Sequence, residues 1–502
     1  MVQQNAKRAA QLPRRPKRAP PRLEHSGRSS DSSPVDHIVV QPRSGSDSFP
    51  EVRTGFTFEP WTSFSNECHN SEGTSPRFAL TEDANSVALS VFFSRYCCQH
   101  RDPDGEPGLN NNLPRLYTES QTSSALTNAI TAFALGIAGR WPERLDWKRL
   151  SVNYYGRAVA SLNVALTGPQ QLRNDELLAT VMQLIAYEKL NLPHIPGSAF
   201  SHVNGLMTIL KLRGVQTCDT EVSKQLLLLA RTHALTIYCS PMQNLSDDEH
   251  LWEDAPVDRP GNLGTSLVKI ASQIRVLRRI ANATSSSDNS DQEQVLETVG
   301  QMISIAMKID SELLEWAAST PIRWEPVAAD VVPLSVQAAG VWKNTCTIDH
   351  NIWSSISWNK YRLARIALPS ILLHQAQRVA ESEAKWQLII ESQKVLRSEV
   401  DGICATVPFH LGSRDTSKTT DQPLIEFPSS NRVQLTEETR EHLVTLGEWF
   451  LFWPFSRVLH NLEWVSAVYP TCVDEEQLHW MREQVARNGR RATTRSSLTP
   501  HI

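Results

Sequence analysis

A cluster of basic residues near the N-terminus has the clearest chemical potential in this sequence. Arg14, Arg15, Lys17 and Arg18 alternate with prolines, and only one acid, Glu24, lies among the basic residues of this segment. Such clusters bind the phosphates of nucleic acids or the acidic grooves of import receptors. A solvated basic tail is the plain alternative. A mitochondrial presequence is disfavoured because the prolines break the amphipathic helix that it needs. We expect nuclear import or phosphate contact from these four residues.

The cysteines do not show the spacing of a metal site. All eight are dispersed, and no Cys-x-x-Cys occurs. Since no signal-peptide core precedes them either, we expect free thiols in a reducing compartment. Cys97 and Cys98 with His100 could suggest a metal or a reactive thiol. Adjacent residues on a helix point in different directions, however, so buried and inert thiols are favoured.

Motifs of known enzyme classes are absent from the sequence. It contains no nucleophile elbow, phosphate-binding loop or His-Glu-x-x-His pair. Asp102, Asp104 and Gly105 resemble the start of a calcium loop, but the later ligands are missing, which favours an acidic turn. We therefore predict no catalytic, cofactor-binding or metal-binding residues in this chain. An acid and base brought together from distant segments would escape such a search.

Composition divides the chain into a folded region and two polar ends. The chain has 502 residues, 40% hydrophobic and 21% charged, which is ordinary for a globular protein, and its net charge of -4 does not mark it as a nucleic-acid binder overall. Residues 1–80 are rich in Pro, Ser, Arg and Gly and are predicted to form a disordered arm. Residues 488–502 are predicted to be a frayed basic tail. The apolar stretch 449–455 is too short to cross a bilayer, so no membrane contact is expected.

The region between these ends, 81–487, has a helical pattern. Strand signals are nearly absent, and apolar residues recur at helical spacing. The third predicted helix, 175–190, has Leu178, Val181, Met182 and Ile185 on one face. We predict an all-α fold, a multi-helix array of packed helical hairpins. The helices are expected at 123–139, 147–166, 175–190, 201–212, 221–238, 267–281, 292–319, 350–380, 384–407, 438–468 (one helix or a pair) and 474–487.

A few residues in this region have predicted scaffold roles. The small residues Gly156 and Gly205 are expected to allow close helix contact. Tyr187 and His202 are expected to tie helix ends by hydrogen bonds, and Arg213 could pair with Glu188. Gly214 follows the last periodic residue of its helix and is the expected C-terminal stop.

Several short segments, in order, resemble one family of gene regulators. The segments Tyr154–Ala158, Asp175–Ala179, Leu184–Glu188, His202–Gly205 and Leu210–Gly214 are similar to the regulatory region of fungal zinc binuclear cluster transcription factors. Further similar segments are 113–117, 358–366, 403–412 and 451–455. The resemblance therefore runs over about residues 81–485.

The resemblance implies an all-helical regulatory domain, a nuclear location and a role in transcription. It also implies partners: a homodimer or a heterodimer with zinc-cluster transcription factors, and the transcription machinery. Family members usually begin with six cysteines that hold two zinc ions and read DNA. Here no cysteine precedes Cys68, so we expect no zinc in this chain. Either an upstream exon is missing from the gene model, or the protein acts without direct zinc-cluster contact and meets DNA weakly or indirectly.

Two other functions stay open on the sequence alone. The chain could be a nuclear co-regulator or ligand-sensing binding module that dimerises with an intact zinc-cluster factor, or, less readily, an enzyme with a helical pocket. Family members often control secondary-metabolite or nutrient-use genes. The sequence does not select target genes, an effector, an oligomeric state or the sign of regulation.

Overall fold

The computed structural model describes residues 83–97, 111–121, 124–139, 145–168, 174–191, 199–240, 262–285, 292–328, 341–411 and 437–491. In this part of the chain the predicted all-α fold is confirmed. One two-stranded antiparallel pair, β1 (Val327–Ala328) with β2 (Thr347–Ile348), interrupts the helices. The basic cluster Arg14, Arg15, Lys17 and Arg18 and the predicted disordered arm lie outside the described residues, as do Cys98 and His100.

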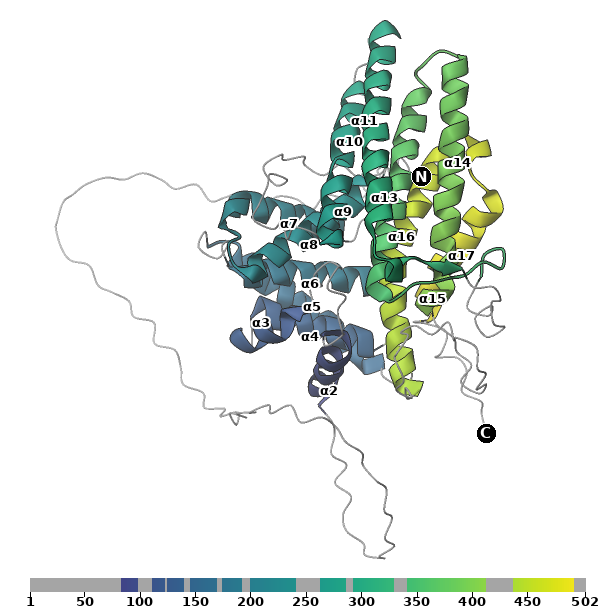
Figure 1. The fold of residues 1–502 in the computed structure, drawn as a ribbon. Coiled ribbons are helices and arrows are strands. Elements are labelled where there is room, and N and C mark those ends of the chain that lie inside the picture. The colour runs from purple at the N-terminus through teal and green to yellow at the C-terminus, as the bar shows by residue number, and fades with distance from the viewer. Residues whose placement is uncertain are drawn as a thin grey trace, which may run out of the picture. The chain divides into compact units, whose positions relative to one another are not determined.

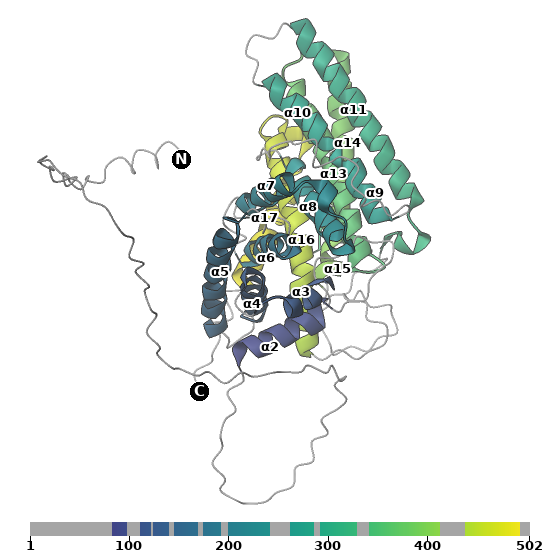
Figure 2. The same cartoon turned by 90° about the vertical axis from the view of Figure 1, so that its left-hand side faces the viewer.

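The helices form two consecutive groups, the first coloured purple to blue-teal and the second teal to yellow in Figures 1 and 2. Short helical turns lie between some of the helices: η1 (Phe92–Cys97), η4 (Val215–Thr217), η6 (Ile322–Trp324) and η7 (Pro470–Cys472). The first group is α2 (Ala84–Val91), α3 (Leu113–Glu119), α4 (Ala125–Ala138), α5 (Leu145–Ala165), α6 (Asp175–Asn191), α7 (Phe200–Arg213) and α8 (Glu221–Tyr238). The second is α9 (Leu263–Ser272), α10 (Ile274–Ser285), α11 (Gln292–Ser319), α13 (Ile352–Ala376), α14 (Glu383–Ala405), α15 (Val407–Leu411), α16 (Glu437–Ser466) and α17 (Glu475–Arg491).

Local capping chemistry explains why most predicted boundaries are confirmed. Ser124 Oγ accepts a hydrogen bond from the Thr127 amide at 3.2 Å and begins α4, and Thr220 begins α8 in the same way. Gly214, at a φ of 80°, ends α7 as predicted.

Other predicted boundaries differ from the structure. The predicted helix 267–281 is two helices, α9 and α10, because the helix is interrupted at Gln273. The helix predicted to end at 487 extends to Arg491 as α17. Of the two options left open for 438–468, the single helix is confirmed, since α16 is one helix with Pro454 inside it.

Helix α4 lies at the centre of the first group and is buried along its length, from Leu126 to Ala138. It packs against α2, α5 and α6. A Cβ on Gly136 would lie 2.6 Å from Asn191 Nδ2, so alanine here would displace the Asn191 side chain at the contact of α4 with α6. Among the described residues, by contrast, no atom lies within 4 Å of a Cβ built on Gly156 or Gly205. The prediction that these two glycines allow close helix contact is therefore wrong.

Helix α6 is buried on every side rather than on the single predicted face. All residues from Leu177 to Leu190 are buried, because α4, α7, α8 and α16 contact it from different directions. The predicted face of Leu178 and its neighbours is buried, but so are the polar residues Glu188 and Lys189. Because burying a polar group without a partner costs free energy, the hydrogen-bond and charge partners of Glu188 and Lys189 determine that cost.

In the second group α13 packs against α11, α14 and α16. Arg365 on α13 joins these helices by ion pairs with Asp310 on α11 at 2.7 Å and Glu399 on α14 at 2.6 Å. Asn351 and Ser354 form a capping box that begins α13. None of the helices in the described ranges has both the length and the apolar character needed to cross a bilayer.

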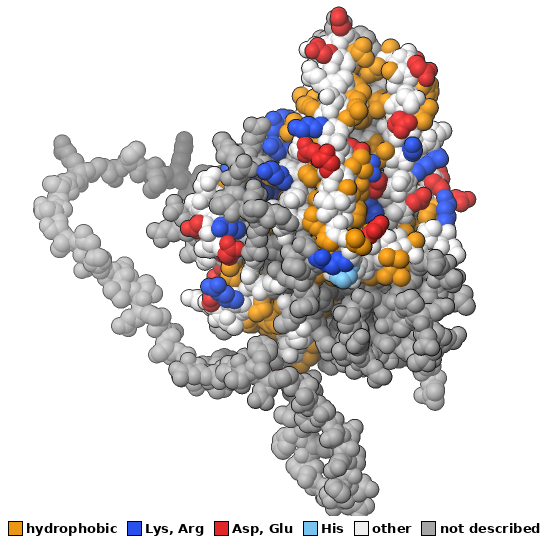
Figure 3. All heavy atoms as spheres, viewed as in Figure 1, with side chains coloured by type: hydrophobic (Ala, Val, Ile, Leu, Met, Phe, Trp, Pro, Cys, Tyr) orange, Lys and Arg blue, Asp and Glu red, His pale blue; other side chains and the backbone are white. Residues whose placement is uncertain are grey.

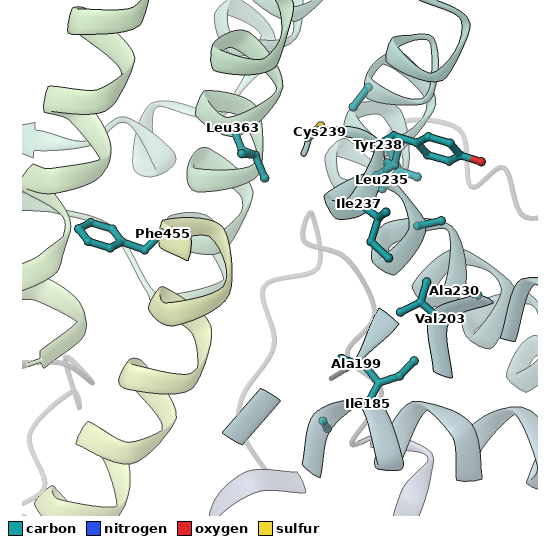
Figure 4. Packing of buried hydrophobic residues seen from close by; sticks show 14 of the residues in the cluster. Ile185, Ala199, Val203, Ala230, Leu235, Ile237, Tyr238, Cys239, Leu363 and Phe455 are labelled. Carbon is teal, nitrogen blue, oxygen red and sulfur yellow. The ribbon is translucent and has the colours of Figure 1, made fainter. Parts of the chain in front are cut away.

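The two groups meet where α6 and α8 face α13 and α16. Figure 4 shows Ile185 of α6 and Leu235 of α8 on one side of this junction, with Leu363 of α13 and Phe455 of α16 on the other. All four side chains belong to one continuous hydrophobic core. Packing across this junction therefore holds the two groups together.

Candidate functional site

A cavity of about 150 Å³ lies at this junction, between α6, α8, α13 and α16. We call it the junction cavity. Its four walls come from segments far apart in the sequence, so helix packing alone creates it. It is lined by Met182, Ala186, Lys189, Leu229, Thr232, His233, Thr236, Trp353, Ile356, Ser357, Lys360, Leu363, Trp449, Phe450, Trp453 and Pro454.

Aromatic side chains form most of one side of the junction cavity. The ring centroids of Trp449 and Phe450 are 4.7 Å apart, and those of Trp353 and Phe450 are 5.5 Å apart in an edge-to-face contact. Trp449 also packs on Phe133 of the central helix α4, at 5.6 Å. Such contacts fix the rings, so this wall is preformed for an apolar molecule.

Lys189 is the unusual residue of the cavity. Its Nζ lies 3.0 Å from His233 Nδ1 and 3.8 Å from the centroid of the Trp453 ring. The residue is only 7% exposed. Among the described residues, Lys189 forms no ion pair with a carboxylate, and no Asp or Glu lines the cavity.

The surroundings of Lys189 add positive charge instead of neutralising it. Burial lowers the pKa of Lys189 well below its ordinary value, and the nearby charges of Arg457 and Lys360 lower it further. Burial likewise lowers the pKa of His233, with Lys189 and Lys360 acting in the same direction. Arg457 lies on the Trp453 ring, 4.1 Å from its centroid. This corner of the cavity is therefore desolvated and lined by basic groups whose protonated forms are disfavoured without an anion beside them.

A second buried cluster resembles a catalytic triad only in composition. Ser355 Oγ lies 3.0 Å from His410 Nε2. Burial raises the pKa of Asp349, although the charge of Arg362 opposes the shift. A triad aspartate would accept a hydrogen bond from the histidine, whereas neither carboxylate oxygen of Asp349 has a hydrogen-bond partner among the described residues. Ser355, His410 and Asp349 are at most 2% exposed, so we interpret the cluster as a polar tie between α13 and α15.

The predicted scaffold residues lie away from the junction cavity. His202 Nε2 contacts Glu188 Oε1 at 3.1 Å, and Tyr187 reaches Ser151 Oγ at 3.4 Å, so both tie neighbouring helices as predicted. The pairing of Arg213 with Glu188 is wrong, because Arg213 Nη2 pairs with Asp175 Oδ1 at 2.8 Å. Glu188 instead accepts a hydrogen bond from Tyr155 at 2.5 Å.

The predicted site residues Arg14, Arg15, Lys17 and Arg18 lie outside the described residues, and their role stays a prediction. Cys97 is buried, in agreement with an inert thiol. Within the described ranges, no group of His, Cys, Asp or Glu is arranged to hold a metal ion.

Sequence reasoning missed Lys189, His233 and Trp453 as candidate site residues. The available signal was the mostly apolar run 177–186, which is broken only by Thr180 and Gln183 and indicates a helix buried on more than one side, close to Lys189. No pattern in the sequence shows that His233 and Trp453 lie beside it.

Comparison with known proteins gives one match. Residues 90–236 match the family model described as fungal specific transcription factor domain, which spans the end of α2 through nearly all of α8. The matched segment supplies the α6 and α8 walls of the junction cavity. The search of curated proteins gave no match. The search of solved structures gave none either.

Proposed function

We propose that this protein is a regulator of transcription, starting from the match of residues 90–236 to the fungal specific transcription factor domain. That match carries the proposal, and it indicates a regulator rather than an enzyme. The all-α fold agrees with the regulatory region that the sequence resembles. In this proposal the helical region 81–487 restrains or releases contacts with the transcription machinery.

A reporter assay tests the proposal directly. The full chain is fused to an unrelated DNA-binding domain and placed upstream of a reporter gene. We expect reporter output to change relative to the DNA-binding domain alone. Unchanged output from a fusion that is present in the nucleus would contradict the proposal.

The basic cluster is proposed to bring the protein into the nucleus. Replacing Arg14, Arg15, Lys17 and Arg18 with alanine should abolish nuclear accumulation of a fluorescent fusion, since import receptors recognise the positive charge. The matched control replaces the three arginines with lysine, which keeps the charge and should keep the location. Nuclear accumulation of the alanine variant would refute this role.

Contact with DNA is proposed to be limited to phosphates. The sequence contains no six-cysteine spacing, and basic arms bind DNA without reading bases. Binding to two unrelated duplexes should therefore be equal and should weaken strongly from low to high salt. Selective binding to one duplex would contradict phosphate-only contact.

A co-regulator that acts through dimerisation is the second candidate, and the surface of α11 favours it. Leu296, Met307 and Leu314 are 58%, 68% and 46% exposed. Met307 and Leu314 are seven residues apart, the repeat with which two helices pair along a seam. In Figure 3 hydrophobic side chains gather over the upright helices that include α11.

We propose a second copy of this chain as the occupant of this face, because the same seam on two copies is self-complementary. The dimer is expected to appear as twice the chain mass in light scattering, and Met307→Lys with Leu314→Lys should convert it to the monomer. A monomeric wild-type protein would refute self-association. A zinc-cluster factor that co-purifies with the monomer would favour the heterodimer instead.

A further inference from the structure

We propose that the junction cavity binds a small organic acid, with the carboxylate against Lys189 and the apolar body against the tryptophans. The claim that this ligand regulates the protein rests on the proposed function. The claim that it binds does not. The argument combines charge, an unsatisfied donor and the shape of the cavity.

The charge argument is that the cavity lacks an anion. An ammonium group removed from water loses hydration, and only an opposite charge or several hydrogen bonds offset that loss. In the described structure Lys189 has His233 as its hydrogen-bond partner and no carboxylate. Arg457 and Lys360 add further positive charge nearby. A bound carboxylate would reverse this imbalance, and a charge-assisted hydrogen bond to Lys189 would stabilise it.

An unsatisfied donor lies in the same corner. The indole Nε1 of Trp453 is buried and has no hydrogen-bond partner among the described residues. Trp453 lines the cavity, and its ring is the one over which Lys189 lies. A buried donor without an acceptor costs free energy. A carboxylate has two oxygen acceptors, enough for both Lys189 Nζ and the indole of Trp453.

The remaining walls set the class of the apolar body. Away from Lys189 the cavity is bounded by Met182, Ala186, Leu229, Trp353 and Phe450. A protein cavity of roughly 150 Å³ with such walls accommodates benzene, and the volume here is about 150 Å³. One aromatic ring, or an aliphatic chain of similar size, therefore fits beside the carboxylate. Inorganic phosphate would leave these apolar walls uncovered, and an organic cation would be repelled by Lys189 and Arg457.

The position of the cavity gives the ligand a route to regulation. Lys189 and His233 belong to the first helix group, whereas Trp353 and Trp453 belong to the second. A molecule in contact with all four favours the conformation in which the groups are joined. Binding should accordingly raise the unfolding temperature of the protein as ligand concentration increases.

The experiment compares three molecules of nearly equal shape on the purified full-length chain. Phenylacetate, phenylacetamide and phenethylamine are titrated while tryptophan fluorescence and heat are recorded, since three tryptophans line the cavity. We expect phenylacetate to bind at least about tenfold more tightly than the amide, equivalent to about 1.4 kcal/mol, and the amine to bind most weakly. Equal binding of acid and amide, tighter binding of the amine, or no saturable binding of phenylacetate at millimolar concentration would each overturn the proposal.

Two variants locate the site. Lys189→Met should abolish the preference for the acid over the amide, whereas Lys308→Met, at an exposed position on α11, should leave it unchanged. Ala186→Leu, which keeps Lys189 and fills the cavity, should weaken both ligands. Persistence of the acid preference in Lys189→Met would overturn the proposal. The comparison of acid, amide and amine on the wild-type chain decides the question even where a variant does not fold.

The proposed acid site and the proposed function can be refuted independently. If phenylacetate binds through Lys189 but the reporter fusion is inactive, the acid site stands and the proposed function falls. If the fusion regulates the reporter but the acid preference is absent, the function stands and the acid site falls.

Discussion

Replacing single glycines with alanine gives a sensitive test of the helix packing. Gly205 lies inside α7, and a Cβ built on it meets no atom of the described part of the chain within 4 Å. Gly402 lies inside α14, and its Cβ would be 2.8 Å from Arg362 Nε and 3.3 Å from Arg362 Cδ. Arg362 is 7% exposed and donates a hydrogen bond to Asn359 at 3.0 Å, so it has little room to move. The two substitutions should therefore change stability in opposite directions.

The magnitudes follow from two opposing terms. Alanine in a helix interior is more favourable than glycine by about 1 kcal/mol, and nothing opposes this gain at Gly205. At Gly402 the steric overlap with a buried side chain costs about 1–3 kcal/mol. We expect Gly205→Ala to gain about 1 kcal/mol and Gly402→Ala to lose roughly 1 kcal/mol, with both estimates built from the same terms.

Urea unfolding followed by far-UV circular dichroism measures the difference in unfolding free energy between the variants. If the free energy of each variant falls with urea at the same slope, their unfolding midpoints can be compared directly. Gly156→Ala is the matched control, because its Cβ also meets no atom within 4 Å. It should resemble Gly205→Ala. The packing described for α14 and α13 would be refuted if Gly402→Ala stabilised the protein as much as Gly205→Ala. A loss of stability in Gly205→Ala would instead support the sequence-based prediction that Gly205 allows close helix contact.

Two further predictions concern a buried histidine and a partly buried ion pair. Burial lowers the pKa of His410 from 6.5 to about 3, so the unfolded chain binds the extra proton below pH 6.5. This histidine then removes up to about 1.4 kcal/mol of stability per pH unit as pH falls from 6.5 towards 3. His410→Gln should flatten the wild-type dependence measured by urea unfolding between neutral and mildly acidic pH, and an unchanged slope would contradict the assignment. Arg213 pairs with Asp175, so a double-mutant cycle with Arg213→Met and Asp175→Asn should give a coupling of about 0.5–3 kcal/mol. The same cycle with Glu188→Gln should give a much smaller value, and the reverse order would contradict the observed pairing.

Local signals in the sequence were sufficient to predict the helices and several of their ends. Ser124, Thr220 and Gly214 act through hydrogen bonds or backbone angles within a few residues of themselves. The resemblance over residues 154–214 also lies within the segment that matches the fungal specific transcription factor domain. These features need no knowledge of distant parts of the chain.

Only the tertiary structure decided which residues meet. Helical spacing assigned one apolar face to α6, but the packing of α4, α7, α8 and α16 around it buries every side and takes Lys189 into the interior. His233 and Trp453 reach Lys189 from positions 44 and 264 residues further along the chain (233 − 189 and 453 − 189). Periodicity records which way a side chain points from its own helix. The neighbour on the other side is set by long-range packing, and that neighbour determines whether a lysine is a solvated surface charge or the centre of a cavity.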